Sequence, residues 1–220
     1  DLGITNNEFR DMSSNPELFS FALESGKSAN PHGVMVDSHS ADDLAESGAL
    51  TFLAKDNLAG GAVMPDGNIT AVFKNPKSKS KRAATDIIIQ ALENGGDRLD
   101  CYGEGLVKMY AQEGFEPVAK VKFNPEYAPE GWDYEALGEP YIYVMAHNGD
   151  SVDDVIKKMN DSSYRTFSQA ELDALPEMEY DDAITYRNQI LEARHNDSLK
   201  SPLPTSEIEA ETTNNSNIPM

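Results

Sequence analysis

Apolar positions along this chain change their spacing repeatedly, which predicts short helices alternating with short strands. Leu18, Phe19, Ala22 and Leu23 recur at helical intervals and predict a helix within residues 1–30. Two apolar runs, 60–64 and 69–73, flank the turn sequence Pro-Asp-Gly-Asn, a pattern typical of a β-hairpin. The same reading predicts further strands at 33–37, 51–54, 98–102, 115–123 and 140–146, and helices at 40–47, 83–94 and 106–113.

The order of these segments indicates an α/β (α+β) domain with a mixed sheet. The character changes from Gly149 onward, where 151–159 and 181–194 have helical spacing and Ser168-x-x-Glu171 matches a capping box. We therefore expect a helical N-terminal lead at 1–30, one domain at 31–148, a helical extension at 149–195 and a disordered tail at 196–220, which has few large apolar groups.

Composition narrows the classes of function. The formal charge is -20, so phosphate backbones would be repelled and non-specific nucleic-acid binding is not expected. The single cysteine, Cys101, excludes an internal disulfide and a cysteine-based zinc site, and the four histidines lack metal-ligand spacing. No apolar run approaches the roughly 20 residues that span a bilayer, and no signal peptide is visible. We expect a cytoplasmic protein without a metal.

Positive charge is concentrated in one place. Five of the 18 Lys and Arg residues fall within nine positions: Lys74, Lys77, Lys79, Lys81 and Arg82. They lie between a predicted strand and a predicted helix, whose N-terminus offers unpaired N–H groups to an anion. The pattern favours a phosphate-bearing ligand, although a solvated loop that offsets neighbouring acids has the same composition. Neither the Walker pattern nor the glycine-rich dinucleotide pattern occurs.

A later motif adds a family resemblance. Residues 109–115 read Met-Tyr-Ala-Gln-Glu-Gly-Phe, followed by a predicted strand. This resembles the Leu-Tyr-x-x-x-Gly-Phe pattern of the GNAT acyltransferases, and the resemblance covers roughly residues 33–148. It implies a mostly antiparallel sheet flanked by helices, with acetyl-CoA bound between splayed strands and no metal. By this resemblance Tyr110 is the acid that protonates the departing thiolate. The residues implied to bind acetyl-CoA are Ala71, Val72, Phe73, Lys79, Ser80, Lys81, Arg82, Ala83 and Ala84.

Four further motifs are similar to GNAT-like domains of bacteriophage polyproteins. They are Asn30-Pro31-His32-Gly33, Pro65-Asp66-Gly67, Gly95-Gly96-Asp97-Arg98-Leu99-Asp100 and Ala128-Pro129-Glu130-Gly131-Trp132-Asp133. Their order along the chain also agrees. The resemblance implies a phage-encoded protein, in the host cytoplasm or packaged in the virion, that meets an amine, hydroxyl or protein acceptor.

Two functions remain open. The first is acetyl transfer from acetyl-CoA to an amine or hydroxyl. The second is an inactive virion or injected protein that binds a phage or host partner. Arg82 and Ala84 stand where the family commonly has glycine, and Gly103 stands where it often has asparagine, which favours the second.

Several individual roles also stay open in the sequence. The general base is not assigned among Asp66, Asp100, Tyr102 and Glu104. Cys101 has the pattern of a small buried hydrophobe rather than a nucleophile. Trp132 and Asp133 could shape an acceptor pocket or simply anchor their loop.

Overall fold

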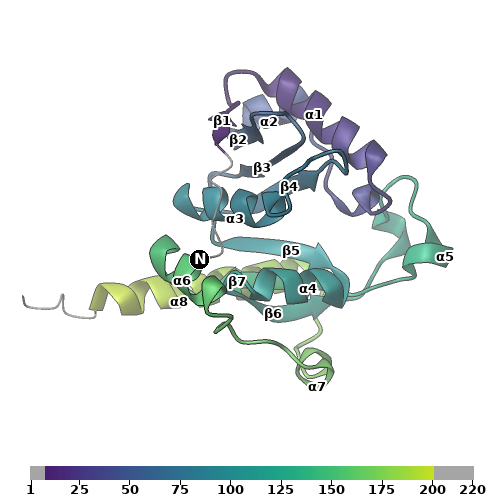
Figure 1. Ribbon diagram of the computed structural model, residues 1–220. Helices are drawn as coiled ribbons and strands as arrows, with labels where there is room; N and C mark the ends of the chain where they lie inside the picture. The colour runs from purple at the N-terminus through teal and green to yellow at the C-terminus, as the bar shows by residue number, and fades with distance from the viewer. Residues whose placement is uncertain (1–7, 201–220) are drawn as a thin grey trace, which may run out of the picture.

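The computed structural model describes residues 8–200, which fold into two sheets with helices around them (Figure 1). In chain order the elements are β1 (Phe9–Asp11), α1 (Pro16–Ala29), the 3-10 helix η1 (Gly33–Met35), α2 (Ala41–Ser47), β2 (Leu50–Ala54), β3 (Ala59–Val63), β4 (Ile69–Lys74), α3 (Ala83–Glu93), β5 (Arg98–Tyr102), α4 (Gly103–Ala111), β6 (Phe115–Val121), the 3-10 helix η2 (Pro125–Tyr127), α5 (Tyr134–Leu137), β7 (Ile142–His147), α6 (Val152–Asn160), α7 (Gln169–Asp173) and α8 (Tyr180–Lys200). Within these residues no helix is long and apolar enough to cross a bilayer.

The first sheet has the strand order β1-β2-β3-β4 and is antiparallel throughout. Helix α1 contacts β2, β3 and β4, while α3 contacts β3 and β4. Figure 1 shows α1 and α3 on opposite sides of this sheet. Both faces are therefore covered, which explains why every residue of β3 is buried. The predicted hairpin is confirmed as β3, the turn at 65–68 and β4.

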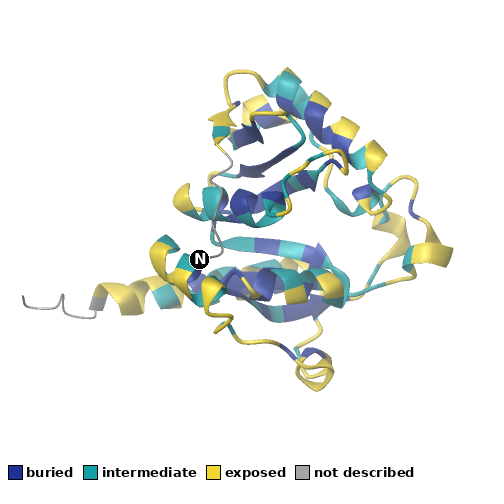
Figure 2. Ribbon diagram, viewed as in Figure 1, coloured by how far each residue is buried: buried dark blue, intermediate teal, exposed yellow. Residues whose placement is uncertain are grey.

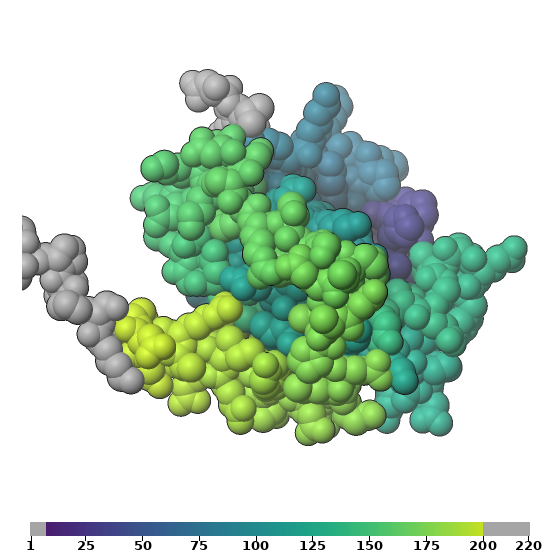
Figure 3. Space-filling view, turned by 90° about the horizontal axis from the view of Figure 1, so that it is seen from below, coloured from purple at the N-terminus to yellow at the C-terminus, as the bar shows by residue number. Residues whose placement is uncertain are grey.

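The second sheet has the order β5-β7-β6 and is also antiparallel. Its two faces pack against different elements. Tyr143 and Met145 of β7 lie in the core formed with α3 and α4, whereas Val144 packs with Ala183 of α8. The segment before α8 reaches the free edge of β6, where Lys120 and Glu177 form a parallel bridge. Figure 3 shows this segment, in green, beside the yellow α8.

The two sheets meet at one end only. Among the described residues, a single parallel bridge between Asn68 and Arg98 joins the start of β4 to the start of β5. Beyond it the strands separate, and within residues 8–200 the edge of β4 that faces β5 has no partner strand. The fold class and the splay expected beside Val72 are therefore confirmed. Helix α3 begins at Ala83 with Arg82 as its N-cap residue, where the sequence placed a helix start.

The hydrophobic core continues across the splay. One cluster of buried residues joins Phe52 of β2, Ile87 of α3 and Leu99 of β5 to Phe115 and Met145 of the second sheet. Figure 2 shows burial following the strands and the inward faces of α1, α3 and α4, while the loop carrying α5 is largely exposed. The splay is thus a gap at one edge of a continuous core.

Three expectations from the sequence were wrong, one in the type of element and two in the extent of a segment. Residues 33–37 form no strand; Gly33–Met35 is a 3-10 helix, because the Gly33 amide bonds to the Asn30 carbonyl at 2.9 Å and turns the chain. The N-terminal lead is not purely helical, since Phe9–Asp11 pairs with β2. Helix α8 continues to Lys200, past the expected tail boundary at 196, because no glycine or proline interrupts residues 181–200. Residues 201–220 of that expected tail lie outside the described residues.

A buried acid in the turn after α4, facing Thr85 of α3, gives a stability prediction. Glu113 is almost completely buried, and its Oε2 atom has no hydrogen-bond partner among the residues that the structure describes. Burial raises the pKa of this carboxyl well above its ordinary value, and a hydrogen bond from Thr85 lowers it only in part. The folded protein therefore holds this proton more tightly than the unfolded chain, so Glu113 should lower stability as pH rises from its unfolded pKa through its folded pKa.

Glu113→Gln should remove this loss. At pH 8 we expect the free energy of unfolding of the variant, measured with denaturant, to exceed that of wild type by about 1–3 kcal/mol. This is the usual cost of a buried polar group left without a partner. The difference should shrink toward pH 4. Glu93→Gln, at an exposed position of α3, is the control and should show no such pH dependence. Equal stability of Glu113→Gln and wild type at both pH values would contradict the prediction.

Candidate functional site

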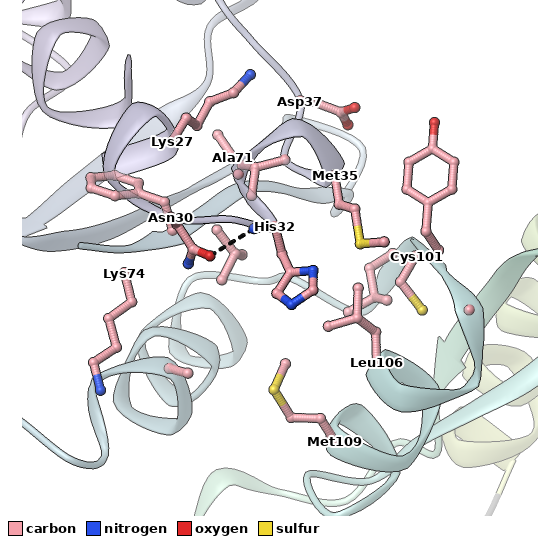
Figure 4. Close-up of a pocket in the computed structure, with 18 of the residues that line it drawn as sticks. Lys27, Asn30, His32, Met35, Asp37, Ala71, Lys74, Cys101, Leu106 and Met109 are labelled. Carbon is pink, nitrogen blue, oxygen red and sulfur yellow. Dashed lines mark hydrogen bonds between the residues drawn. The ribbon is translucent and has the colours of Figure 1, made fainter. Parts of the chain in front are cut away.

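A cavity of about 590 Å³ opens where β4 and β5 separate. Its walls are the length of β4, the end of β5, and inward positions of α3 and α4. The end of α1 and the η1 segment cover it, and Ala136, Leu137 and Pro140 of the loop around α5 border it. Figure 4 shows this arrangement, with side chains from the α1–η1 segment facing those of α4. The site is therefore assembled from four separate parts of the chain.

The β4 wall is distorted by a bulge. Gly60 pairs with Phe73 and Ala62 with Thr70, so the two residues Ala71 and Val72 stand opposite the single residue Gly61. Ala71 has φ of 51°, a left-handed conformation that is unfavourable for a residue with a Cβ atom. The bulge interrupts the regular alternation of β4 at the place where it borders the cavity. Backbone groups of this edge are therefore available to a ligand rather than to a neighbouring strand.

The residues proposed from sequence to bind acetyl-CoA divide into two groups. Ala71, Val72, Phe73 and Ala84 all line the cavity. Five others do not line it: Lys79, Ser80, Lys81, Arg82 and Ala83. Lys79 and Lys81 are exposed, and Ser80 and Ala83 border a separate, smaller hollow of about 320 Å³. The strand residues and the first turn of α3 thus converge, while the basic loop lies outside the cavity wall.

Tyr110 lies on the α4 wall and is 8% exposed. Its ring packs edge-to-face on Phe115, with centroids 6.2 Å apart. Burial raises the pKa of its hydroxyl, and the neighbouring Cys101, Glu113 and Asp100 raise it further. The hydroxyl is consequently held in its protonated form near neutral pH. It therefore carries a proton near neutral pH and cannot act as a base there.

The four candidate bases are also separated by the structure. Asp100 and Tyr102 line the cavity, whereas Asp66 and Glu104 do not. Asp66 accepts a hydrogen bond from the Asn68 amide at 2.9 Å within the hairpin turn. Glu104 accepts one from Gln169 at 2.6 Å. These two carboxylates therefore hold local structure.

Asp100 has an unusual environment. Burial raises the pKa of its carboxyl, the nearby Asp37 raises it further, and Arg187 and a hydrogen bond from Tyr180 oppose that shift. The Tyr180 hydroxyl lies 3.2 Å from Asp100 Oδ2. Arg187 is itself buried beneath β5 and donates to the Leu99 carbonyl at 3.4 Å. Helix α8 thus supplies the groups that hold Asp100 at the cavity edge.

The sequence reading missed the contribution of residues 26–37. His32, Met35 and Asp37 all line the cavity, and Asp37 accepts a hydrogen bond from Thr70 of β4 at 3.3 Å. The Asn30-Pro31-His32-Gly33 motif was the available signal, but it carried no role because residues 33–37 read as a strand. The turn at Gly33 brings this segment over the cavity instead.

Cys101 and Trp132 behave as structural residues. Cys101 is buried, and burial raises the pKa of its thiol, so it is not a thiolate nucleophile near neutral pH. The indole of Trp132 packs against Tyr102 and Phe123 and donates to the Gly138 carbonyl at 2.9 Å. Asp133 caps α5. Both residues therefore anchor the loop that borders the cavity.

Comparisons with known proteins give little beyond this geometry. No protein-family model matches the chain, and no curated protein is similar to it in sequence. A search of solved structures finds, among others, a crystal structure from Rhodopseudomonas palustris described as a GCN5-related N-acetyltransferase and as an aminotransferase, class-II. The identity is 14% and the TM-score 0.40, over 67% of this chain and 98% of that one. A similarity of this size carries no functional argument.

Within residues 8–200 no three His, Cys, Asp or Glu side chains lie close enough together to hold a metal ion.

Proposed function

We propose that this protein binds acetyl-CoA in the cavity between β4 and β5 and transfers the acetyl group to an amine or hydroxyl acceptor. The observation that carries the proposal is the bulged edge of β4, which has no partner strand in the described part of the chain and borders the cavity together with the first turn of α3 and Tyr110. These are the elements that the GNAT resemblance of residues 33–148 assigns to the cofactor. The phage origin implied by the motifs belongs to the same proposal.

The two ends of the site suit the two ends of acetyl-CoA. Backbone groups of Ala71, Val72 and Phe73 would pair with the amides of the pantetheine arm, as a second strand would. The first turn of α3 directs unpaired N–H groups and the positive end of its dipole toward the phosphates. Lys74 lines the cavity at the end of β4, where the basic loop begins. Cationic side chains of that loop would add charge near the phosphates from outside the cavity.

Acetyl-CoA supplies an activated acetyl group as a thioester. Backbone N–H groups at the β4 bulge are placed to stabilise the negative charge that develops on the carbonyl oxygen when the acceptor attacks. The protonated Tyr110 hydroxyl then donates its proton to the departing sulfur. Residues of this chain thus account for orientation, charge stabilisation and the acid.

The basic loop supports a second function. Lys79 and Lys81 lie outside the cavity, and Arg82 stands where the family commonly has glycine. A GNAT-like domain that has lost phosphate binding would act as a binding module, for a phage or host protein. Measured affinity for acetyl-CoA separates the two functions.

Gly105 offers a test of where acetyl-CoA binds. It lines the cavity on α4, and a Cβ atom added there would meet no other atom within 4 Å. We expect wild type to bind acetyl-CoA with a dissociation constant in the range of about 1 μM to 1 mM usual for substrates. Gly105→Trp should weaken binding by roughly tenfold or more by filling the cavity, which corresponds to 1.4 kcal/mol. Gly105→Ala should bind like wild type and raise stability by up to about 1 kcal/mol.

Titration calorimetry measures the affinities, and thermal unfolding checks that each variant folds. Wild-type protein that binds neither acetyl-CoA nor CoA at millimolar concentration would exclude the transferase and leave the binding module. Binding that Gly105→Trp does not weaken would place acetyl-CoA outside this cavity.

A further inference from the structure

His32 lines the cavity and is itself exposed to solvent. It belongs to the segment between α1 and η1, and Figure 4 shows its imidazole facing Leu106 and Met109 of α4, with Met35 beside it. Tyr110 follows Met109 on the same helix and lines the same cavity. The imidazole therefore occupies the space between the β4 wall and the helix that carries the proposed acid.

The backbone that presents His32 is fixed on both sides. Its amide donates to the Asn30 side chain at 2.9 Å, and its carbonyl accepts from the Met35 amide at 3.0 Å. The next residue, Gly33, is buried, and a Cβ atom there would lie 2.0 Å from the Lys27 carbonyl oxygen. Only glycine permits this close approach between the segment and the end of α1. The position of His32 is thus held by packing and hydrogen bonds of its neighbours.

The imidazole itself takes no part in holding that structure. His32 is the N-cap residue of η1, yet its side chain makes no capping hydrogen bond. Within residues 8–200 its ring makes no hydrogen bond or ion pair, and the residue is exposed to solvent at the cavity. A structural histidine normally bonds through at least one ring nitrogen, as His147 does to the Glu113 carbonyl at 3.1 Å. The ring nitrogens of His32 are available to a ligand.

The two carboxylates that line the cavity each accept a hydrogen bond from a neighbouring side chain. Asp37 accepts a hydrogen bond from Thr70, and Asp100 accepts one from Tyr180. Both carboxylates therefore make polar contacts with other parts of the protein, whereas the imidazole of His32 faces the apolar side chains of Leu106 and Met109 (Figure 4). Histidine is also the side chain that most often accepts a proton in general base catalysis.

We propose that His32 is the general base of the acyl transfer. As the acceptor nitrogen or oxygen forms its bond to the acetyl carbon, one ring nitrogen of His32 takes the proton that this atom loses. The bond from the acetyl carbon to sulfur then breaks, and Tyr110 gives its proton to the sulfur. The inference rests on the proposed function, because it requires the acetyl group to lie between β4 and α4.

The location of the imidazole can be tested without turnover. Diethyl pyrocarbonate modifies accessible imidazoles, and peptide mass spectrometry reports each histidine separately. Acetyl-CoA at saturating concentration should slow the modification of His32 at least about tenfold, the extent expected when about nine-tenths of the protein is liganded. His195, exposed on α8, should react equally with and without it. Unprotected His32 in protein that binds acetyl-CoA would overturn the assignment while leaving the proposed function in place.

Turnover tests the role itself. Release of CoA from acetyl-CoA is measured with water, ethanolamine and lysine methyl ester as probe acceptors. His32→Ala and His32→Gln should lower kcat by roughly 10²-fold or more, as expected for a lost general base. Their thermal stability and affinity for acetyl-CoA should stay close to those of wild type. Added imidazole should restore turnover to His32→Ala but have no effect on wild type or on the control His195→Ala.

Three results would overturn the assignment. One is a His32→Ala variant with wild-type kcat, and a second is a loss of kcat that imidazole does not restore. The third is a wild type that binds acetyl-CoA but releases no CoA with any probe, which would leave a binding module. Absence of binding by wild type is a different outcome, because it removes the proposed function together with the inference.

Discussion

Replacing Tyr110 by phenylalanine is expected to lower acetyl transfer by roughly 10²-fold or more while leaving the affinity for acetyl-CoA unchanged. The ring would keep its edge-to-face contact with Phe115 and its place in the core. Only the hydroxyl is removed, and with it the proton for the departing sulfur. A lost general acid typically costs about 10²–10⁴ in rate. The effect should therefore fall on kcat rather than on binding.

The structure also keeps this hydroxyl in its protonated form. Burial and the neighbouring Cys101, Glu113 and Asp100 all raise the pKa of Tyr110, so the group is protonated throughout the neutral range. Activity should therefore show no loss from ionisation of Tyr110 as pH rises through that range. Because the variant has no such hydroxyl, its remaining activity should come from proton donation by water.

Tyr143→Phe is the matched control. Tyr143 is a buried tyrosine of the second sheet that does not line the cavity. Its variant should have the kcat of wild type. Turnover is measured as CoA release under saturating acetyl-CoA, and affinity by calorimetry. If both variants lost the same fraction of activity, the effect would come from disturbance of the core, and the acid role of Tyr110 would be wrong.

The sequence was most informative where local rules decide the structure. The turn at Pro65–Asn68 and the helix after Arg82 depend on a few neighbouring residues, and both occur where they were predicted. The capping boxes at Ser40 and Ser168 follow the same logic, because each satisfies helix N–H groups with a side chain three residues away. The splay between β4 and β5 came from the family resemblance.

The covering of the cavity could not be predicted in this way. Whether Gly33 continues a strand or turns depends on its contact with the Lys27 carbonyl, which local apolar spacing does not reveal. Once the turn forms, His32 and Asp37 reach the cavity from outside the two sheets. The bulge at Ala71 is similar, since an apolar run reads the same with or without one extra residue in the ladder.

The structure places the basic loop differently from what its sequence suggested. Its charge suggested direct contacts with the diphosphate, yet Lys79, Lys81 and Arg82 do not line the cavity. Among the described residues Lys79 and Lys81 make no ion pair, and both are exposed. They precede the N-terminus of α3, where the phosphates are proposed to lie. Their charge can act on the phosphates from the solvent side.

Replacing Lys79, Lys81 and Arg82 together by alanine should therefore weaken binding of CoA by about a hundredfold. An exposed charge pair contributes up to about 1 kcal/mol, and each 1.4 kcal/mol is tenfold in affinity. Three cationic side chains acting on the same diphosphate give an effect of this size, and salt would screen it. The loss should be smaller at high salt, and it should be much smaller for pantetheine, which has no phosphate. Both ligands are titrated by calorimetry.

A control must remove the same charge elsewhere, because the chain carries a net charge of -20 that already disfavours an anionic ligand such as CoA. Lys122, Lys157 and Arg165 replaced together by alanine meet this requirement, since all three lie outside the cavity and the basic loop. This variant should lose only the part of the affinity that comes from net charge. Equal losses in the two triple variants would mean that the loop acts through overall charge. CoA binding that survives the loop substitutions unchanged would mean that the basic loop serves another ligand, for which a protein partner is then the best candidate.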